Sequence, residues 1–145
     1  MRVALFVSLV VIGSPAVAEA RTTAFESPSG NITCVISTGG GQPSFAQCEV
    51  RSRGVGYSVR RHGRVSTYDV AAHDDLAHRR FVLGYGRSVR RGAFRCRSRE
   101  SGMTCRSLAS GHGFKVSRER ARLFSWAMRG RLEANGVRRE RPYPG

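Results

Sequence analysis

The chain has few acidic residues, a single lysine, and no long hydrophobic run after its first residues. Its 145 residues include 25 basic and only 10 acidic side chains, which give a formal net charge of +15 at pH 7. Every basic residue except Lys115 is arginine. After residue 20, no apolar stretch approaches the roughly 20 residues that a transmembrane helix needs, so we expect no membrane-spanning segment there. The basic balance favours anionic partners.

Motifs that mark several enzyme classes are also absent. The sequence has no Cys-x-x-Cys pair for thiol redox chemistry, and no Gly-x-Ser-x-Gly elbow for a serine hydrolase. The run Gly39-Gly40-Gly41 lacks the lysine and the following helix of a phosphate-binding loop. We therefore expect no cofactor and no metal centre, and we identify no complete catalytic set.

The first twenty residues have the three parts of a secretory signal peptide. A short basic start precedes the apolar run 3–12, and small residues at Ala18 and Ala20 suit signal cleavage. The run is too short to cross a bilayer and Pro15 breaks it, although a retained anchor helix is the alternative. We expect residues 1–20 to be removed and the protein to be exported, soluble in the periplasm or outside the cell. Binding to intracellular nucleic acid is not expected.

The four cysteines fall in two local pairs, which an exported protein can hold as disulfides. Four cysteines allow three connectivities. A turn centred on Glu100-Ser101 places Cys96 opposite Cys105, and Cys34 similarly faces Cys48 across a glycine-rich loop. We predict the pairs Cys34–Cys48 and Cys96–Cys105, each contributing about 2–3 kcal/mol by constraining the unfolded chain. A four-cysteine zinc site is the alternative.

Short alternating segments separated by glycine-rich turns fill the middle of the chain. They predict strands near 31–37, 45–51, 54–59, 64–70, 81–83, 94–98, 103–107 and 114–116, with an edge segment beginning at Val89. Residues 25–31 are predicted to be a turn-rich entry. The pattern indicates a mainly β protein of the α+β kind, a small antiparallel sheet or partly open barrel with disulfide-bonded hairpins and one C-terminal helix. We expect a single domain over residues 21–136.

The last part of the chain changes to helical spacing. Ser117 is a suitable N-cap, Glu119 lies in the first turn, and apolar residues recur at helical intervals after it. We predict a helix over about 118–135 whose apolar stripe packs on the core. The alternatives are a membrane-binding face and a docking surface for a protein partner through Trp126 and Met128. Residues 137–145 are rich in arginine and contain two prolines, so we predict a disordered basic tail there.

Three motifs occur together in order along the chain. They are the SPSGNIxC segment that ends at Cys34, the GxTC segment that ends at Cys105, and the GHGFxxSR segment that ends at Arg118. In this order they resemble a family of small exported bacterial proteins of unknown function, over roughly residues 25–124. The resemblance implies export and a disulfide-bonded domain, and it implies no activity. Residues 51–80 lack the cysteine and tryptophan that many members carry there, so a third disulfide is absent.

Two histidine-bearing segments are candidate sites. His112 lies between two glycines, and it is either a general base or ligand contact near Ser110 or Ser117, or the brace of a tight turn. The segment His73-Asp74-Asp75 and His78 contain potential metal ligands. The histidine spacing places them on different faces of a helix, so we prefer a solvated acidic turn.

Arginines alternate along the predicted strand 94–98 and its extension, so their side chains project from one face. A fourth arginine on the partner strand pairs with the first in the predicted register. With Tyr57 or Tyr85 nearby, this basic ribbon is suited to phosphate-bearing polymers. The alternative is an ordinary exposed sheet face, on which arginine is frequent because a GC-rich coding sequence favours arginine codons. The predicted binding residues are Arg95, Arg97, Arg99 and Arg106.

Three functions are consistent with these patterns. The preferred hypothesis is an exported, non-catalytic module that binds anionic envelope or extracellular material, either anionic polymers or an anionic membrane surface, through its arginines. The first alternative is an exported hydrolase that uses His112 at the glycine-rich turn. The second is a structural module that binds a protein partner through its C-terminal helix.

Overall fold

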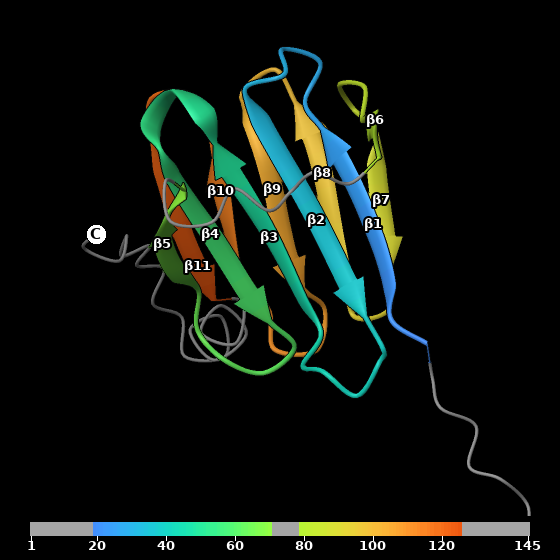
Figure 1. Cartoon of the computed structure of the whole chain (residues 1–145). Coiled ribbons are helices and arrows are strands. Elements are labelled where there is room, and N and C mark those ends of the chain that lie inside the picture. Colours follow the sequence, from blue (N-terminus) through green and yellow to red (C-terminus); the bar gives the residue numbers. More distant parts are fainter. Residues whose placement is uncertain (1–18, 71–78, 126–145) are drawn as a thin grey trace, which may run out of the picture.

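The computed structural model describes residues 19–70 and 79–125, and within them the chain folds into two β-sheets. Figure 1 shows the six-stranded sheet in front of the five-stranded sheet. The predicted mainly β class is confirmed, but the strands form two packed sheets and not a barrel. The predicted signal peptide at 1–20 lies almost entirely outside the described residues. No helix in the described ranges is long and apolar enough to span a membrane.

The first sheet has the strand order β5-β4-β3-β2-β1-β6. Neighbouring strands pair antiparallel except β1 and β6, which pair parallel. A short 3-10 helix, Arg51–Arg53, connects β3 to β4. The strands are β1 (Arg21–Glu26), β2 (Ile32–Thr38), β3 (Phe45–Val50), β4 (Val55–Arg60), β5 (Ser66–Asp69) and β6 (Arg80–Val82).

The second sheet has the order β11-β10-β9-β8-β7, and all its pairings are antiparallel. Cys96 lies opposite Cys105 and Arg95 opposite Arg106, which is the register that the predicted hairpin turn requires. The strands are β7 (Ser88–Arg91), β8 (Phe94–Arg99), β9 (Gly102–Ser107), β10 (His112–Val116) and β11 (Ala121–Ser125).

The core lies between the two sheets, because alternate residues of each strand face inward. Phe25, Ile36, Phe94, Met103 and Phe114 are among its largest fully buried side chains. Full burial of a large apolar side chain contributes about 1.5–3 kcal/mol. These inward-facing residues therefore supply much of the driving force that holds the sheets together.

The two disulfides meet at the centre of this core. Cys34 is bonded to Cys48 within the first sheet, and Cys96 to Cys105 within the second. These are the local pairs that the strand pattern favours. The Sγ atoms of Cys48 and Cys105 lie 3.4 Å apart, so the disulfides pack against each other across the sandwich. Each disulfide therefore contributes packing between the sheets as well as a constraint within its own hairpin.

The predicted helix over 118–135 is wrong where the structure describes it. Residues 121–125 form β11, which pairs antiparallel with β10. Ser117 does not cap a helix: its Oγ accepts a hydrogen bond from the Arg120 N–H at 3.2 Å within the turn between the strands. Ala121 and Leu123 alternate inward against the core, so the segment also satisfies a two-residue period. Residues 126–135 and the predicted tail at 137–145 lie outside the described part.

The segment 25–31, predicted to be a turn-rich entry, divides between a strand and a turn. Its first two residues end β1, which begins at Arg21 and pairs with both β2 and β6. The side chain of Phe25 is fully buried. In the turn that follows, the Ser27 Oγ accepts a hydrogen bond from the Ile32 N–H at 3.1 Å. The Ser-Pro-Ser-Gly segment therefore makes the tight connection from β1 to β2.

Candidate anion-binding surface

The outer face of the second sheet carries a set of basic side chains that we call the basic face. In β8, buried and exposed residues alternate, so Arg95, Arg97 and Arg99 project to the solvent side. The ladder partners of these residues share that side, because residues directly opposite each other in a sheet face the same way. The basic face consists of Arg90, Arg95, Arg97, Arg99, Arg106, Lys115 and Arg122.

Like charges stand opposite one another in this face. Arg95 lies between Arg90 on β7 and Arg106 on β9, and Lys115 on β10 lies opposite Arg122 on β11. Opposing like charges on neighbouring strands destabilise a sheet. The arrangement therefore has an electrostatic cost that a bound anion would relieve.

The outer face of the first sheet has a different charge pattern. Its strands carry Glu26 and Glu49 as well as Arg60 and Arg80, and the Nε of Arg80 lies 3.7 Å from a carboxylate oxygen of Glu26. A base composition that favours arginine would enrich both outer faces alike. The strands of the basic face carry no acidic residue among the described residues, so composition alone does not account for the basic face.

The basic face is built on a close approach of β9 and β10. A Cβ at Gly113 would overlap the carbonyl oxygen of Cys105 and would lie 2.8 Å from the Cβ of Arg106. Any side chain at position 113 would therefore displace the neighbouring strand. Because glycine has no side chain, β9 with the half-buried Arg106 can lie close against position 113.

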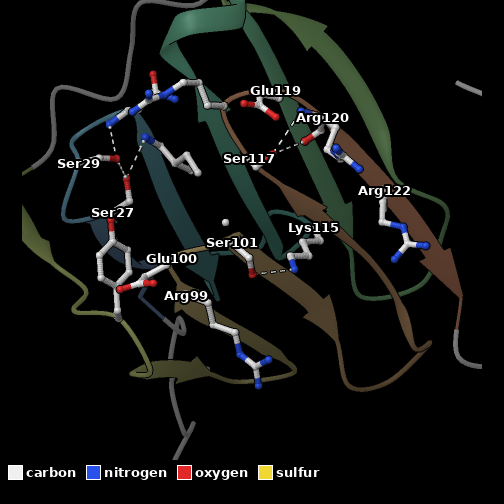
Figure 2. Close-up of a pocket in the computed structure, with 15 residues that line it drawn as sticks. Ser27, Ser29, Arg99, Glu100, Ser101, Lys115, Ser117, Glu119, Arg120 and Arg122 are labelled. Atoms are coloured by element: carbon white, nitrogen blue, oxygen red, sulfur yellow. Dashed lines mark hydrogen bonds between the residues drawn. The ribbon is translucent and has the colours of Figure 1, made fainter.

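A pocket of about 820 Å³ lies at one end of the basic face. Three turns form it: 27–31 between β1 and β2, 100–101 between β8 and β9, and 117–120 between β10 and β11. Figure 2 shows Ser27 and Ser29 on one side of this space, and Ser101, Ser117 and Glu119 on the other. The lining also includes Arg99, Lys115 and Arg122, so the pocket adjoins the basic face.

Hydrogen bonds within the lining hold several polar groups in place. The Nζ of Lys115 donates to the Ser101 Oγ at 2.9 Å, as Figure 2 shows. The Oγ atoms of Ser27 and Ser29 lie 3.1 Å apart. The backbone N–H of Ser117 donates to the carbonyl oxygen of Arg120 at 2.9 Å. The polar groups of the three turns are therefore ordered in the free protein.

The two tyrosines proposed as aromatic partners have different environments. Tyr57 is only 4% exposed and packs on Phe114 in the core, with ring centroids 5.9 Å apart, so its proposed surface role is wrong. Tyr85 is 46% exposed and lines the pocket. Only Tyr85 of this pair is therefore accessible to a ligand.

His112 begins β10 at the opposite end of the strand from the pocket. Its backbone N–H donates to the Ser110 Oγ at 3.3 Å, but its imidazole has no hydrogen-bond partner among the described residues. Ser117 lies beyond the far end of β10, so it is not next to the imidazole. The structure therefore places Ser110 beside the backbone of His112, but among the described residues the imidazole has neither a serine nor a carbonyl oxygen as a hydrogen-bond partner.

The remaining candidate metal ligands do not form a site that the structure describes. The segment 73–78 lies outside the described residues. Ligand atoms of Cys34, Cys48 and Cys105 lie within 4.8 Å of one another, but all three sulfurs are in disulfides. Disulfide sulfurs are not thiolates, so this cluster is no zinc site in the oxidised protein.

Sequence reasoning missed part of this surface. Arg90 follows from the pairing of β7 with β8, while Lys115 and Arg122 join the basic face through β10 and β11. The alternation of Arg122 between Ala121 and Leu123 is a strand signal, but the stronger helical spacing of the longer segment obscured it. The pocket has no sequence signal of its own, because its three turns are far apart along the chain.

The comparisons with known proteins assign the chain to a family. Residues 42–124, more than half of the chain, match the model of DUF6636, a family of unknown function. No curated protein and no solved structure matches the chain. The matched residues contain β3 to β10 and most of β11, and therefore all seven residues of the basic face. The chain thus belongs to this family of unknown function.

Proposed function

We propose that the protein is an exported, non-catalytic module that binds anionic envelope or extracellular material on its basic face. The observation that carries the proposal is the contrast between its two outer faces. Seven cations cover one face, with no acidic residue on its described strands, whereas acidic and basic residues mix on the other.

The geometry of the sheet suits an extended polyanion. Strands lie about 4.8 Å apart, and alternate residues along a strand repeat about every 6.7 Å. The described residues contain no ion-pair partner for Arg95, Arg97 or Arg99, so binding an anion there breaks no existing salt bridge. Guanidinium groups also make bidentate contacts to carboxylate, sulfate and phosphate groups.

The disulfide framework supports the exported setting. Both disulfides are fully buried, and Cys96–Cys105 holds the β8–β9 hairpin, which carries four of the seven cations of the basic face. Disulfides persist in oxidising compartments such as the periplasm and the cell exterior. The N-terminal leader predicted from the sequence agrees with that location.

The test compares two variants with the same change in net charge. Arg95→Gln/Arg97→Gln removes two cations from the basic face. Arg60→Gln/Arg61→Gln removes two exposed arginines at the C-terminal end of β4, in the other sheet. Binding of oxidised protein to anionic vesicles, lipopolysaccharide, a polyuronate and DNA is measured across a salt series.

We expect the first variant to lose tenfold or more in affinity for the preferred ligand. We also expect its slope of log affinity against log salt to fall by about one for each cation removed. The control variant should retain the wild-type affinity within about threefold. Equal losses in both variants would show non-specific charge attraction and would contradict a defined binding face.

A further inference from the structure

We propose that the pocket beside the basic face binds the terminal sugar of an acidic oligosaccharide, whose following residues lie along the basic face. The inference rests on the proposed function, because the basic face must hold the rest of the chain. Beyond the proposed function, the inference names the class of ligand and the direction in which the ligand lies along the protein surface. The terminal sugar enters a pocket formed by three turns, while the charged chain extends across the strands.

The first observation is the number of hydroxyl groups in the pocket. Ser29, Ser101 and Ser117 contribute hydroxyls from three different turns, and the buried Ser27 lies behind Ser29. The Asn31 side chain is held in the lining by hydrogen bonds of its amide to Ser52. Figure 2 shows these serines on opposite sides of the same space. Hydroxyls and amides both donate and accept hydrogen bonds, as the hydroxyls around a pyranose ring require. A few such groups converging in a concave site are typical of small-ligand recognition.

The second observation is that part of this set is fixed before any ligand binds. The Ser27 Oγ accepts from the Ile32 N–H at 3.1 Å, and the Ser101 Oγ accepts from Lys115 at 2.9 Å. The Ser117 Oγ lies 3.2 Å from both the backbone N and the carbonyl oxygen of Arg120. A pre-organised site lowers the entropy that a ligand loses on binding.

The third observation is the division of charge. Figure 2 shows the guanidinium groups of Arg99 and Arg122 directed away from the centre of the pocket, toward the outside. The lining includes the carboxylates of Glu100 and Glu119 beside five cations, Arg99, Lys115, Arg118, Arg120 and Arg122. Carboxylates repel a densely charged anion but accept hydrogen bonds from sugar hydroxyls. The pocket therefore combines carboxylates that accept hydrogen bonds from sugar hydroxyls with cations that attract an acidic group. This combination suits the end of an acidic oligosaccharide, whose following anionic groups lie on the basic face.

The half-exposed ring of Tyr85 completes the site. Tyrosine combines an apolar ring face with a polar hydroxyl, and Tyr85 is 46% exposed in the lining of this pocket. The ring offers an apolar surface to the C–H face of a sugar.

The experiment uses oligomers of a hexuronic acid with two, four and eight residues, titrated calorimetrically into the oxidised protein. Two variants narrow the pocket from different turns: Ser29→Trp and Ser101→Trp, both at exposed positions. Ser66→Trp is the matched control, because Ser66 is exposed on β5 of the other sheet. Circular dichroism and the urea midpoint verify that each variant is folded.

We expect both pocket variants to lower the affinity for the four-residue oligomer by tenfold or more. Their salt slopes should match that of the wild type, because the cations of the basic face are unchanged. The control should bind as the wild type does, and a neutral oligosaccharide of equal length should bind at least tenfold more weakly than the uronate.

The outcomes separate the two proposals. Wild-type binding of the uronate with no loss in either pocket variant would overturn the pocket inference and leave the basic-face function standing. DNA or polyphosphate that binds more tightly than the uronate, and loses affinity in the pocket variants, would overturn the assignment to a sugar. A wild-type protein that binds none of these polyanions would overturn the proposed function itself.

Discussion

Two buried serines on neighbouring strands are expected to respond in opposite ways to replacement by alanine. Ser98 on β8 is 1% exposed and Ser107 on β9 is fully buried. The Ser98 Oγ has no hydrogen-bond partner among the described residues. The Ser107 Oγ donates to the carbonyl oxygen of Arg61 at 2.8 Å. It also accepts from the N–H groups of Ala109 and Ser110 at 3.3 and 3.4 Å.

The magnitudes follow from these hydrogen bonds. Burying a hydroxyl with no partner costs about 1–3 kcal/mol, and Ser→Ala removes one oxygen atom while leaving little new space. We expect Ser98→Ala to raise the free energy of unfolding by about 1 kcal/mol. Ser107→Ala removes three hydrogen bonds and leaves a carbonyl oxygen and two N–H groups without that partner. We expect it to lower the free energy of unfolding by about 2 kcal/mol.

Urea denaturation of oxidised protein, followed by far-ultraviolet circular dichroism, measures both effects. The urea midpoints should shift in opposite directions with unchanged m-values, because neither substitution alters the surface exposed on unfolding. Wild-type protein on the same day is the reference. A Ser98→Ala variant that is neutral or less stable would refute the reasoning, since the hydroxyl would then have a stabilising partner in solution.

Three further predictions concern the core and the first sheet. Cys96→Ala/Cys105→Ala should lower the free energy of unfolding by about 3 kcal/mol. The disulfide joins residues with a sequence separation of 9, and closing a loop of this length stabilises the fold by about 2.7 kcal/mol. A loss under about 1 kcal/mol in urea denaturation would contradict this. Gly56→Ala should cost about 1–3 kcal/mol in the same assay, since its Cβ would overlap the ring of Tyr68, and an unchanged midpoint would contradict that packing. Burial raises the pKa of the Tyr68 phenol, and the charge and hydrogen bond of Glu49 raise it further. The neutral phenol therefore stabilises the folded state fully below about pH 10, and this stabilisation is lost as the pH rises further. Alkaline denaturation should therefore be less steep in Tyr68→Phe, and identical profiles would contradict the assignment.

The hairpins were predictable because their information is local. The tight turn at Glu100-Ser101 fixes which residues of β8 and β9 face each other, and the alternation of arginine with buried residues fixes which side is exposed. The same signals determined the cysteine pairs. Strand β1 was missed because its pairing with β2 and β6 depends on contacts made elsewhere in the sheet.

The segment after Ser117 shows why local signals fail when two structures share them. A serine followed by residues with free N–H groups suits a helix N-terminus, and it suits a tight turn equally well. Pairing with β10 gives β11 a full ladder of backbone hydrogen bonds along one side. Burial of Ala121 and Leu123 on the core then favours the strand, a contribution that helix propensity does not contain.

The formation of strand β11 where a helix was predicted also changes the proposed binding surface. In a strand, Arg122 faces outward beside Lys115, which extends the basic face from the predicted hairpin to the edge strand β11. In a helix, it would have no fixed relation to the arginines of β8. The predicted arginines therefore form only one part of the basic face, and the remainder depends on long-range strand order. The pocket depends on it still more, because turns separated by up to about 90 residues meet there only after both sheets have packed.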